Sequence, residues 1–230
     1  MKLTKKTKKL LEINVLKSYK ELSLTVADIV EHILSLPKPK LILPTGSTPL
    51  SLYKELVNRD LDWSTATTYN LDEYVDNTIQ EQSYKYFMWE NLFNHININE
   101  DNVFFPSDIA VWPDMDYGVG VDLCLLGIGG NGHIAFNEPG SSFESETRMV
   151  DLTKETIKDN SRFFPTIDDV PTQAVTMGLK SIMSSKKIVL MVSGEHKLNI
   201  MNVAMAGEVT ESIPASILQT HNNVEVYYCD

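Results

Sequence analysis

Residues 121–133 read VDLCLLGIGGNGH, and this stretch decides the fold class. Val121 to Leu126 is a short, nearly continuous apolar run, which is typical of a strand buried on both of its faces. A turn with four glycines in six residues, 127–132, follows at once. Glycine has no Cβ atom, so such a turn lets the backbone approach a ligand closely. The stretch therefore predicts a buried strand that ends at a binding turn.

Similar short apolar runs lie on both sides of this stretch and alternate with helical patterns. The expected strands are Lys40–Leu43, Thr67–Leu71, Lys187–Val192 and Val224–Tyr228, and the expected helices are Tyr84–Phe93, His196–Ala206 and one from Ser18 to before Pro37. This alternation predicts an α/β fold with a mainly parallel sheet and helices on both faces. Ligands bind at the carboxyl ends of the strands in such sheets. The turns of interest therefore follow Leu43, Asn70, Leu126 and Val192.

Two helix starts are expected from their capping residues. Ser18 and Glu21 have the spacing of a capping box at the start of the first helix. Thr48 is the expected N-cap of the second helix, with Pro49 at the first helical position.

Length and charge limit the kinds of protein this can be. The chain has 230 residues, and its 43% hydrophobic and 22% charged residues are typical of a globular protein. We expect a basic, flexible tail over residues 1–10 and one domain over residues 11–230. The net charge of −11 argues against nucleic acid as a partner. There is no signal-peptide pattern and no apolar run of about 18 residues, so we expect no association with a membrane.

Cysteine usage indicates the compartment. Cys124 and Cys229 are the two cysteines of the sequence, and their spacing suggests neither a disulfide framework nor a zinc site. We therefore expect a cytoplasmic protein without a metal.

The turn after Leu43 reads PTGSTP (44–49) and joins a strand to a helix start. Its backbone N–H groups, its hydroxyl groups and the helix dipole form a candidate anion site. It is not a Walker A loop, because GxxxxGK[ST] is absent. The alternative interpretation is an ordinary N-cap turn.

Two adjacent carboxylates, Asp72 and Glu73, follow the next expected strand. Successive side chains of an extended chain point to opposite sides, so at most one of them should face a shared site. A carboxylate that is shielded from water can serve as a general base. The alternative is a structural aspartate that caps a helix.

The glycine-rich turn continues as HIAFNEP (133–139), and its glycines do not fit the GxGxxG dinucleotide pattern in register. His133 lies within this polar turn and is a candidate functional residue. Glu138 lies five residues further on, close enough to orient the imidazole. Arg162 and Lys197 are candidate cations for an anionic substrate, with an ordinary surface charge as the alternative for each.

Together, these motifs resemble those of the glucosamine-6-phosphate deaminase (isomerase) family. From about Leu11 onward they occur in the family's order: LPTGSTP (43–49), NLDEYV (70–75), LLGIGGNGHIAFNEPGSSF (125–143), NSRFF (160–164), AVTMG (174–178), SGEHK (193–197) and PASILQTH (214–221). Their spread over the chain makes the resemblance specific. It implies a modified doubly wound α/β fold that binds a sugar phosphate at the strand ends.

The resemblance also implies an activity, the conversion of glucosamine 6-phosphate to fructose 6-phosphate and ammonia without a cofactor. Asp72 would move a proton between C2 and C1 of the open-chain sugar. His133, with Glu138 and Asn131, would open the pyranose ring. The residues implied to hold the substrate phosphate are Gly46, Ser47, Thr48, Arg162 and Lys197.

The sequence departs from the family pattern at two places near these motifs. Some members carry aspartate where this chain has Asn131, and an amide can orient a group but cannot accept a proton. We therefore expect Asn131 to position its neighbours. Residues 107–119 are expected to form a shorter segment than the family's usual helix.

A second set of departures concerns regulation. Longer relatives continue beyond the position of Asp230 and contribute an effector-site tyrosine in allosteric hexamers. Arg148 and Ser141 resemble retained pieces of that effector site, whereas Val150 and Asp151 stand where basic and hydroxyl side chains are expected. We therefore expect a monomer or a small homo-oligomer rather than an allosteric hexamer.

Two other functions are compatible with this type of fold. A 6-phosphogluconolactonase would share the fold and the phosphate pocket but would not need a base at Asp72. A non-catalytic sugar-phosphate sensor would need an attached DNA-binding domain, for which we see no room in this acidic chain.

Overall fold

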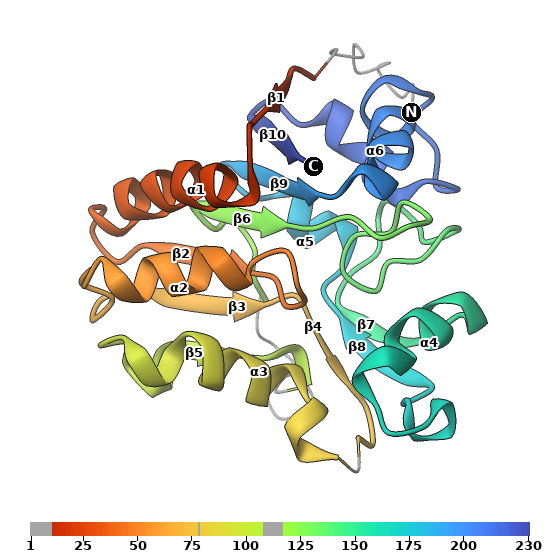
Figure 1. Cartoon of the computed structure of the whole chain (residues 1–230), viewed down its shortest axis with the longest axis horizontal. Helices are drawn as coiled ribbons and strands as arrows, with labels where there is room; N and C mark the ends of the chain where they lie inside the picture. The colour runs from red at the N-terminus through yellow and green to blue at the C-terminus, as the bar shows by residue number, and fades with distance from the viewer. Residues whose placement is uncertain (1–10, 78, 108–116) are drawn as a thin grey trace.

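The computed structural model describes residues 11–77, 79–107 and 117–230, so the expected tail over residues 1–10 and most of residues 107–119 lie outside it. Seven strands form one sheet in the order β1-β10-β9-β6-β2-β3-β5, and every neighbouring pair is parallel (Figure 1). The mainly parallel sheet is thereby confirmed. Its strands are β1 (Ile13–Val15), β2 (Lys40–Leu43), β3 (Thr67–Asn70), β5 (Val103–Phe104), β6 (Leu123–Leu126), β9 (Ile188–Ser193) and β10 (Val224–Cys229).

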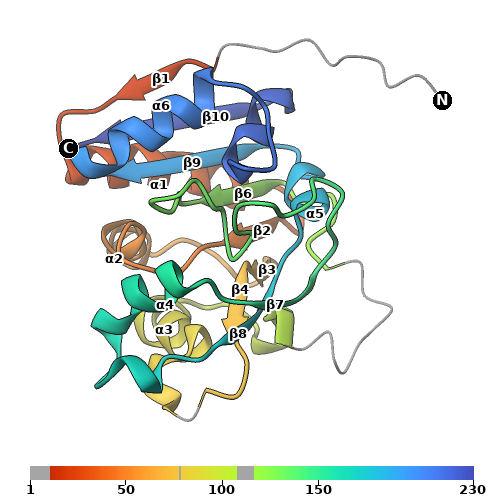
Figure 2. The same ribbon diagram turned by 90° about the vertical axis from the view of Figure 1, so that its right-hand side faces the viewer.

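Helices cover both faces of this sheet, as expected. Residues of the first three helices share one buried cluster with one face, and residues of two later helices share a second cluster with the other face. The first group is α1 (Tyr19–Leu34), α2 (Leu50–Asn58) and α3 (Tyr84–Asn91), and the second is α5 (Leu179–Met183) and α6 (Leu198–Ala206). Another helix, α4 (Lys154–Asn160), lies beside β7 and β8 in both ribbon views (Figure 2).

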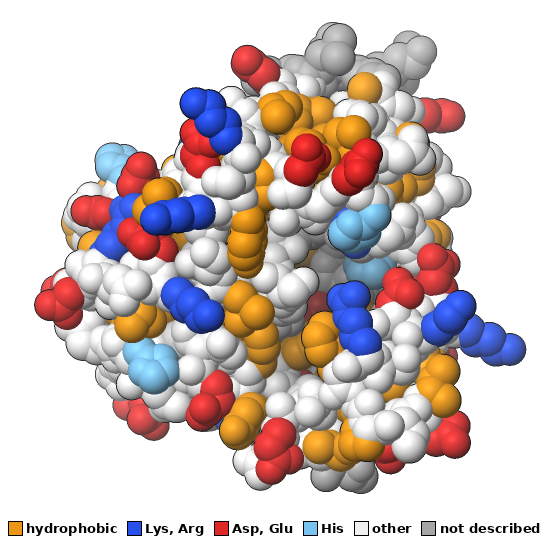
Figure 3. All heavy atoms as spheres, viewed as in Figure 1, with side chains coloured by type: hydrophobic (Ala, Val, Ile, Leu, Met, Phe, Trp, Pro, Cys, Tyr) orange, Lys and Arg blue, Asp and Glu red, His pale blue; other side chains and the backbone are white. Residues whose placement is uncertain are grey.

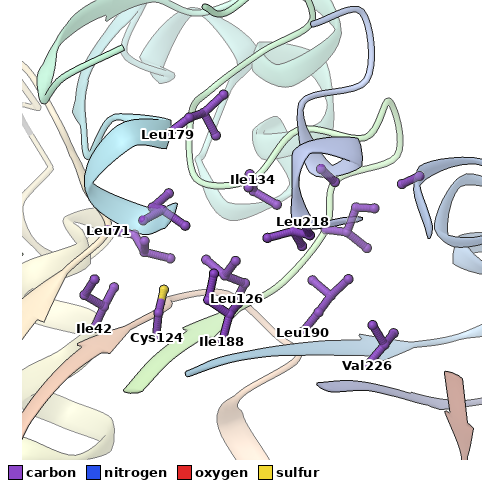
Figure 4. Packing of buried hydrophobic residues seen from close by; sticks show 14 of the residues in the cluster. Ile42, Leu71, Cys124, Leu126, Ile134, Leu179, Ile188, Leu190, Leu218 and Val226 are labelled. Atoms are coloured by element: carbon purple, nitrogen blue, oxygen red, sulfur yellow. The ribbon is translucent and has the colours of Figure 1, made fainter. Parts of the chain in front are cut away.

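Alternation along the central strands explains why their sequences are apolar throughout. Ile42, Cys124 and Leu190 belong to the cluster under α5 and α6 (Figure 4), whereas Leu41 and Leu123 belong to the cluster under α1 to α3. Successive side chains of a strand point to opposite faces, and here both faces are buried. Burying an aliphatic side chain such as leucine or isoleucine contributes about 1.5–3 kcal/mol, so both clusters stabilise the sheet.

The strand order reverses between β2 and β6. From β2 the sheet continues to β3 on one side, and from β6 it continues to β9 on the other. In open α/β sheets the crevice outside the carboxyl ends of such strands binds ligands. The turns that follow Leu43 and Leu126 lie at this crevice.

A second, three-stranded sheet was not expected from the sequence. It has the order β4-β8-β7, is antiparallel, and consists of β4 (Asp72–Tyr74), β7 (Arg148–Asp151) and β8 (Gln173–Thr176). The strand expected over Thr67–Leu71 ends at Asn70, and after Leu71 the chain enters β4. The carboxylates expected in a turn therefore lie on a strand of their own.

The helix caps differ in part from the expected ones. The Ser18 side chain accepts the Glu21 N–H as an N-cap should, but the Glu21 carboxylate accepts from the N–H of Lys17 rather than that of Ser18. Helix α2 begins at Leu50 after Pro49, so the expected Thr48 cap was wrong.

Tyr19 of α1 explains this difference at α2. Its hydroxyl oxygen accepts the N–H of Ser51 at 3.1 Å and lies 2.8 Å from the carbonyl oxygens of both Ser47 and Thr48. A side chain from another helix therefore caps α2. Sequence reasoning looks for a cap within the local residues, and this contact spans 32 positions.

Two helix boundaries also differ from the expected ones. Helix α3 ends at Asn91, and Phe93–His95 form a separate 3₁₀ turn. Helix α6 begins at Leu198, after a 3₁₀ turn over Glu195–Lys197. Within the described ranges, no helix is both long and apolar enough to cross a membrane.

Candidate active site

A cleft of about 590 Å³ opens at the carboxyl ends of the central strands and is visible as a hollow in Figure 3. All four turns selected from the sequence contribute to its wall. The wall also includes residues of α3, α4 and the turn that follows α4. Among the lining residues with polar or charged side chains are Ser47, Thr48, Asp72, His133, Asp159, Arg162, His196 and Lys197.

One part of the wall is suited to an anion. Gly46 has φ of 94°, a conformation that side-chain-bearing residues rarely adopt, and it is followed in the wall by Ser47 and Thr48. Arg162 and Lys197 line the same cleft. The five residues expected to hold a phosphate are thus brought to one cleft from three separate segments.

The two cations of this part differ in their surroundings. Lys197 is half-buried and donates from Nζ to the carbonyl oxygen of Ile128 at 2.9 Å; its burial lowers its pKa. Arg162 is exposed, and its guanidinium lies over the Phe163 ring at 4.7 Å. Neither forms an ion pair within 4.0 Å with a carboxylate in the described part of the chain. Both charges are therefore available to an anion in the cleft.

The carboxylates Asp72 and Glu73 have different environments. Asp72 lines the cleft but is only 7% exposed. Glu73 is directed elsewhere and accepts the backbone N–H groups of Tyr74, Tyr84 and Lys85 at 2.7–2.9 Å. As expected, only one of the two carboxylates faces the cleft. Glu73 instead joins β4 to the first turn of α3.

Burial controls the protonation of Asp72. It raises the pKa of Asp72 to about 8, and the charge of Glu73 adds to the shift. A carboxyl group with a pKa near neutrality can both remove and return a proton under physiological conditions. Asp72 is therefore the candidate general base of the cleft.

The raised pKa of Asp72 has a consequence for stability. The folded protein retains a proton that the unfolded chain releases, so the free energy of unfolding should fall as pH rises from about 4 to about 8. Asp72→Asn has no proton to lose at this position. We expect it to be more stable than the wild type above pH 8, by about 1–5 kcal/mol, and to lose most of this advantage below about pH 4.

Urea unfolding at several pH values measures this difference. Asp76→Asn is a matched control, because Asp76 is exposed, lies two residues after Tyr74 and has φ of 55°, which asparagine tolerates. A difference between Asp72→Asn and the wild type that stays constant with pH would contradict the raised pKa.

His133 belongs to a hydrogen-bonded chain. Asn131 donates from Nδ2 to Oε2 of Glu138 at 3.0 Å, and its Oδ1 accepts from the backbone N–H of His133 at 3.2 Å and lies 2.7 Å from Nδ1 of the ring. The other oxygen of Glu138 accepts from the hydroxyl groups of Thr153 and Thr156. Asn131 and Glu138 lie behind His133 rather than in the cleft wall.

This chain fixes the tautomer of His133. The Asn131 amide presents its nitrogen to Glu138 and its oxygen to the imidazole, and an amide oxygen can only accept a hydrogen bond. Nδ1 of His133 then carries the proton, and Nε2 carries a free lone pair. Burial lowers the pKa of His133, which favours this neutral form. His133 can therefore accept a proton at Nε2.

Gly129 gives the imidazole its place. A Cβ atom at position 129 would lie 2.1–2.4 Å from three atoms of the His133 ring. The ring thus packs directly on the backbone of the glycine-rich turn. This contact explains why at least one glycine of the turn is required.

Sequence reasoning missed several residues of the site. Tyr74 and Asn160 lie in quoted motifs and line the cleft, but no role was expected for them. Alternation on β4 could have shown that Tyr74 shares a side with Asp72. The hydroxyl groups of Thr153 and Thr156 carried no signal, because they meet Glu138 from 15 and 18 residues away.

Comparisons with known proteins agree with the resemblance. The family model described as glucosamine-6-phosphate isomerases/6-phosphogluconolactonase matches residues 19–227. A glucosamine-6-phosphate deaminase of Lachnoclostridium phytofermentans is 47% identical, over 92% of this chain and 96% of its own. This chain belongs to the glucosamine-6-phosphate deaminase family. A second deaminase of the family, from Malacoplasma penetrans, is 45% identical, over 94% of this chain and 98% of its own.

Solved structures separate the two branches that share the fold. A monomeric glucosamine-6-phosphate deaminase superposes with a TM-score of 0.86 at 35% identity, covering 95% of this chain and 97% of its own. A 6-phosphogluconolactonase from Shewanella baltica superposes with a TM-score of 0.76 at 19% identity, covering 97% and 99%. The second likeness shows the shared fold alone. By sequence, the chain is similar to the deaminase branch.

No group of three or more His, Cys, Asp or Glu side chains able to hold a metal occurs in residues 11–77, 79–107 and 117–230. Cys124 and Cys229 are both buried free thiols.

Proposed function

We propose that the protein is a deaminating aldose–ketose isomerase that converts glucosamine 6-phosphate and water to fructose 6-phosphate and ammonia in the cytoplasm, as part of amino-sugar catabolism. The observation that carries this proposal is the shared cleft of Asp72, His133 and the anion site. A buried carboxylate and a neutral imidazole supply two separate proton acceptors. The names of the relatives support the same reaction.

Ring opening is the first step of the proposed reaction. Nε2 of His133 takes the proton from the C1 hydroxyl, the bond between C1 and the ring oxygen breaks, and the imidazolium gives the proton to the ring oxygen. The imidazole becomes cationic during this step, and Glu138, through Asn131, stabilises that charge. The fixed tautomer means that no ring reorientation is needed before the proton moves.

Proton transfer between carbons follows. Asp72 removes the C2 proton of the open-chain amino aldehyde and returns a proton to C1. The C1 oxygen takes up a proton and the amine loses one, which leaves a C1 hydroxyl group and an imine at C2. Water adds to this imine and ammonia departs. The chemistry needs no metal or redox cofactor, because the C1 aldehyde and the C2 amine already acidify the C2 proton.

An ammonia-release assay with glucosamine 6-phosphate tests this function directly. Hydrolysis of 6-phosphogluconolactone, measured beside it, tests the alternative enzyme. Ammonia release with no lactone hydrolysis supports the proposal. Lactone hydrolysis alone would replace it with the lactonase, and tight binding of the sugar phosphate without either reaction would point to a sensor.

Binding of the substrate phosphate should depend on both Arg162 and Lys197. Charged hydrogen bonds contribute about 1.5–3 kcal/mol each, so Arg162→Ala and Lys197→Ala should each weaken the apparent affinity for glucosamine 6-phosphate by about ten- to a hundredfold. The measurement is KM for glucosamine 6-phosphate beside the rate with unphosphorylated glucosamine. Lys158→Ala removes an exposed charge from the same region and is the control.

The unphosphorylated sugar shows whether Arg162 acts through the phosphate. It should be a poor substrate of the wild type and nearly insensitive to Arg162→Ala, because it lacks the group that Arg162 holds. Equal losses with both sugars would mean that Arg162 supports the fold instead.

Regulation should be simple in this protein. Val150 packs against a hydrophobic cluster, and the Asp151 carboxylate accepts from the Gln173 side chain at 2.7 Å. The Arg148 guanidinium donates to Asn137 and Ser141. We therefore expect a monomer or small homo-oligomer whose rate depends hyperbolically on substrate, without activation by N-acetylglucosamine 6-phosphate. Initial rates with and without that compound measure this; sigmoidal kinetics relieved by it would contradict the prediction.

A further inference from the structure

Tyr74 lies on the same strand as Asp72 and shares its side. Strand β4 contains only Asp72, Glu73 and Tyr74, and both outer residues line the cleft while Glu73 does not. This follows the alternation of an extended chain. A contact that restrains Tyr74 therefore also restrains the backbone of Asp72, the proposed base.

The hydroxyl group of Tyr74 joins this strand to a distant segment. It accepts from Nδ2 of Asn160 at 2.9 Å, across 86 positions of the sequence. Asn160 is the last residue of α4, and Arg162 follows in the 3₁₀ turn over Ser161–Phe163. One hydrogen bond therefore lies between the strand of Asp72 and the turn of Arg162.

Aromatic side chains shield the Tyr74 end of this hydrogen bond from water, whereas Asn160 is half-buried. Tyr74 is 6% exposed, and its ring centroid lies 4.8 Å from Tyr84, 5.6 Å from Phe136 and 5.7 Å from Phe164. Phe164 directly follows the turn that carries Arg162. Water competes little with a hydrogen bond that is shielded in this way, and leaving a buried donor or acceptor unpaired is costly.

The other end of α4 is also tied to the site. Thr153, the N-cap of α4, and Thr156 donate to Glu138, which supports His133 through Asn131. Helix α4 has only seven residues. It thus contacts Glu138, behind His133, through its first turn and the strand of Asp72 through its last residue, and Arg162 follows two residues later.

We infer that Tyr74 is a positioning residue that holds Arg162 at a fixed distance from Asp72 through the Tyr74–Asn160 hydrogen bond. This inference rests on the proposed function for the roles of Arg162 and Asp72. In the proposed reaction the substrate binds Arg162 through its phosphate and reacts at C2 beside Asp72. The separation of Arg162 and Asp72 therefore determines whether C2 lies next to the base. A displacement of about 1 Å between reacting groups can slow catalysis by about a hundredfold.

Tyr74→Phe tests the inference, because it removes the hydroxyl group and keeps the ring in its aromatic cluster. We expect it to weaken the binding of inorganic phosphate, and to raise KM for glucosamine 6-phosphate, by about three- to tenfold, the range of one neutral hydrogen bond. The Tyr74 hydroxyl group also accepts from the Tyr84 hydroxyl at 3.3 Å, so Tyr74→Phe removes two hydrogen bonds and Asn160→Ala removes one of these two. Asn160→Ala should reproduce most of the effect, and the double variant should be no worse than Tyr74→Phe alone.

Two comparisons separate positioning from general damage. Tyr86→Phe makes the same substitution at an exposed residue of α3 and controls for it. Tyr74→Phe should lose most of its effect on phosphate binding in the Asn160→Ala background, whereas an effect that did not pass through Asn160 would persist there.

Phosphate binding is measured by calorimetry and needs no turnover, so it decides the inference even if ammonia release fails. Additive losses in the double variant, or phosphate binding unchanged in Tyr74→Phe, would overturn the inference. A lower kcat with unchanged phosphate binding would do so as well, since it would mean that the hydroxyl group acts on the reacting carbons directly.

Discussion

Asp72→Asn should lower kcat for ammonia release by at least about 10²–10⁴-fold, the contribution expected of a general base. The amide has nearly the same shape as the carboxylate but cannot accept the C2 proton. Substrate affinity should change little, because the phosphate is held by other segments of the cleft. Steady-state rates of purified Asp72→Asn and wild type, with ammonia as the readout, measure this.

The pH dependence adds a second test of the same residue. Since burial raises the pKa of Asp72 to about 8, kcat/KM of the wild type should increase as pH rises toward that value. The residual activity of Asp72→Asn should not show this increase with pH. Asp76→Asn should behave as the wild type does in both rate and pH profile. Near-wild-type turnover in Asp72→Asn would exclude Asp72 as the base.

The central strands of the main sheet could be predicted because they are buried on both faces, whereas the short edge strands β1 and β5, whose residues are half-buried or exposed, were not expected. Runs such as Lys40–Leu43 and Val121–Leu126 are apolar whichever way their side chains point, so they stand out without knowledge of their partners. The ligand rule for parallel sheets then selected the four turns that line the cleft. This part of the fold could therefore be predicted from short local segments of the sequence.

The second sheet could not be predicted in the same way. Its strands have three or four residues, and β7 (Arg148–Asp151) alternates half-buried with exposed side chains. Asp72 pairs with Thr176, more than 100 positions away, so no local pattern records the contact. The Tyr19 cap of α2 and the Tyr74–Asn160 bond escaped for the same reason.

The candidate site also combines features that the local sequence predicts with features that depend on distant residues. The positions of Asp72 and His133 follow from strand ends and glycines, which are local signals. What gives them their chemistry is non-local: the burial of Asp72, and Thr153 and Thr156 behind Glu138. Their proposed roles in catalysis remain predictions.

His133→Gln should have the second large effect, and it should depend on the form of the sugar supplied. Glutamine can hydrogen-bond but cannot exchange a proton at neutral pH, so the ring-opening step loses its acid–base group. We expect ammonia release from closed glucosamine 6-phosphate to fall by about 10²–10³-fold, within the range for general acid–base catalysis. The residual rate would reflect spontaneous opening of the sugar in solution.

Proton exchange at C1 of fructose 6-phosphate provides the contrast, because phosphorylation at O6 prevents this ketose from forming a pyranose. The exchange requires Asp72 but not the opening of a pyranose, so His133→Gln should slow it much less than it slows ammonia release. His32→Gln, at an exposed position of α1, controls for the substitution. Both assays are measured on the same protein preparation, so a loss of folded protein would reduce both rates equally. Equal losses in the two assays, with folding shown intact by unfolding curves, would therefore mean that His133 acts throughout the reaction and has no separate role in ring opening.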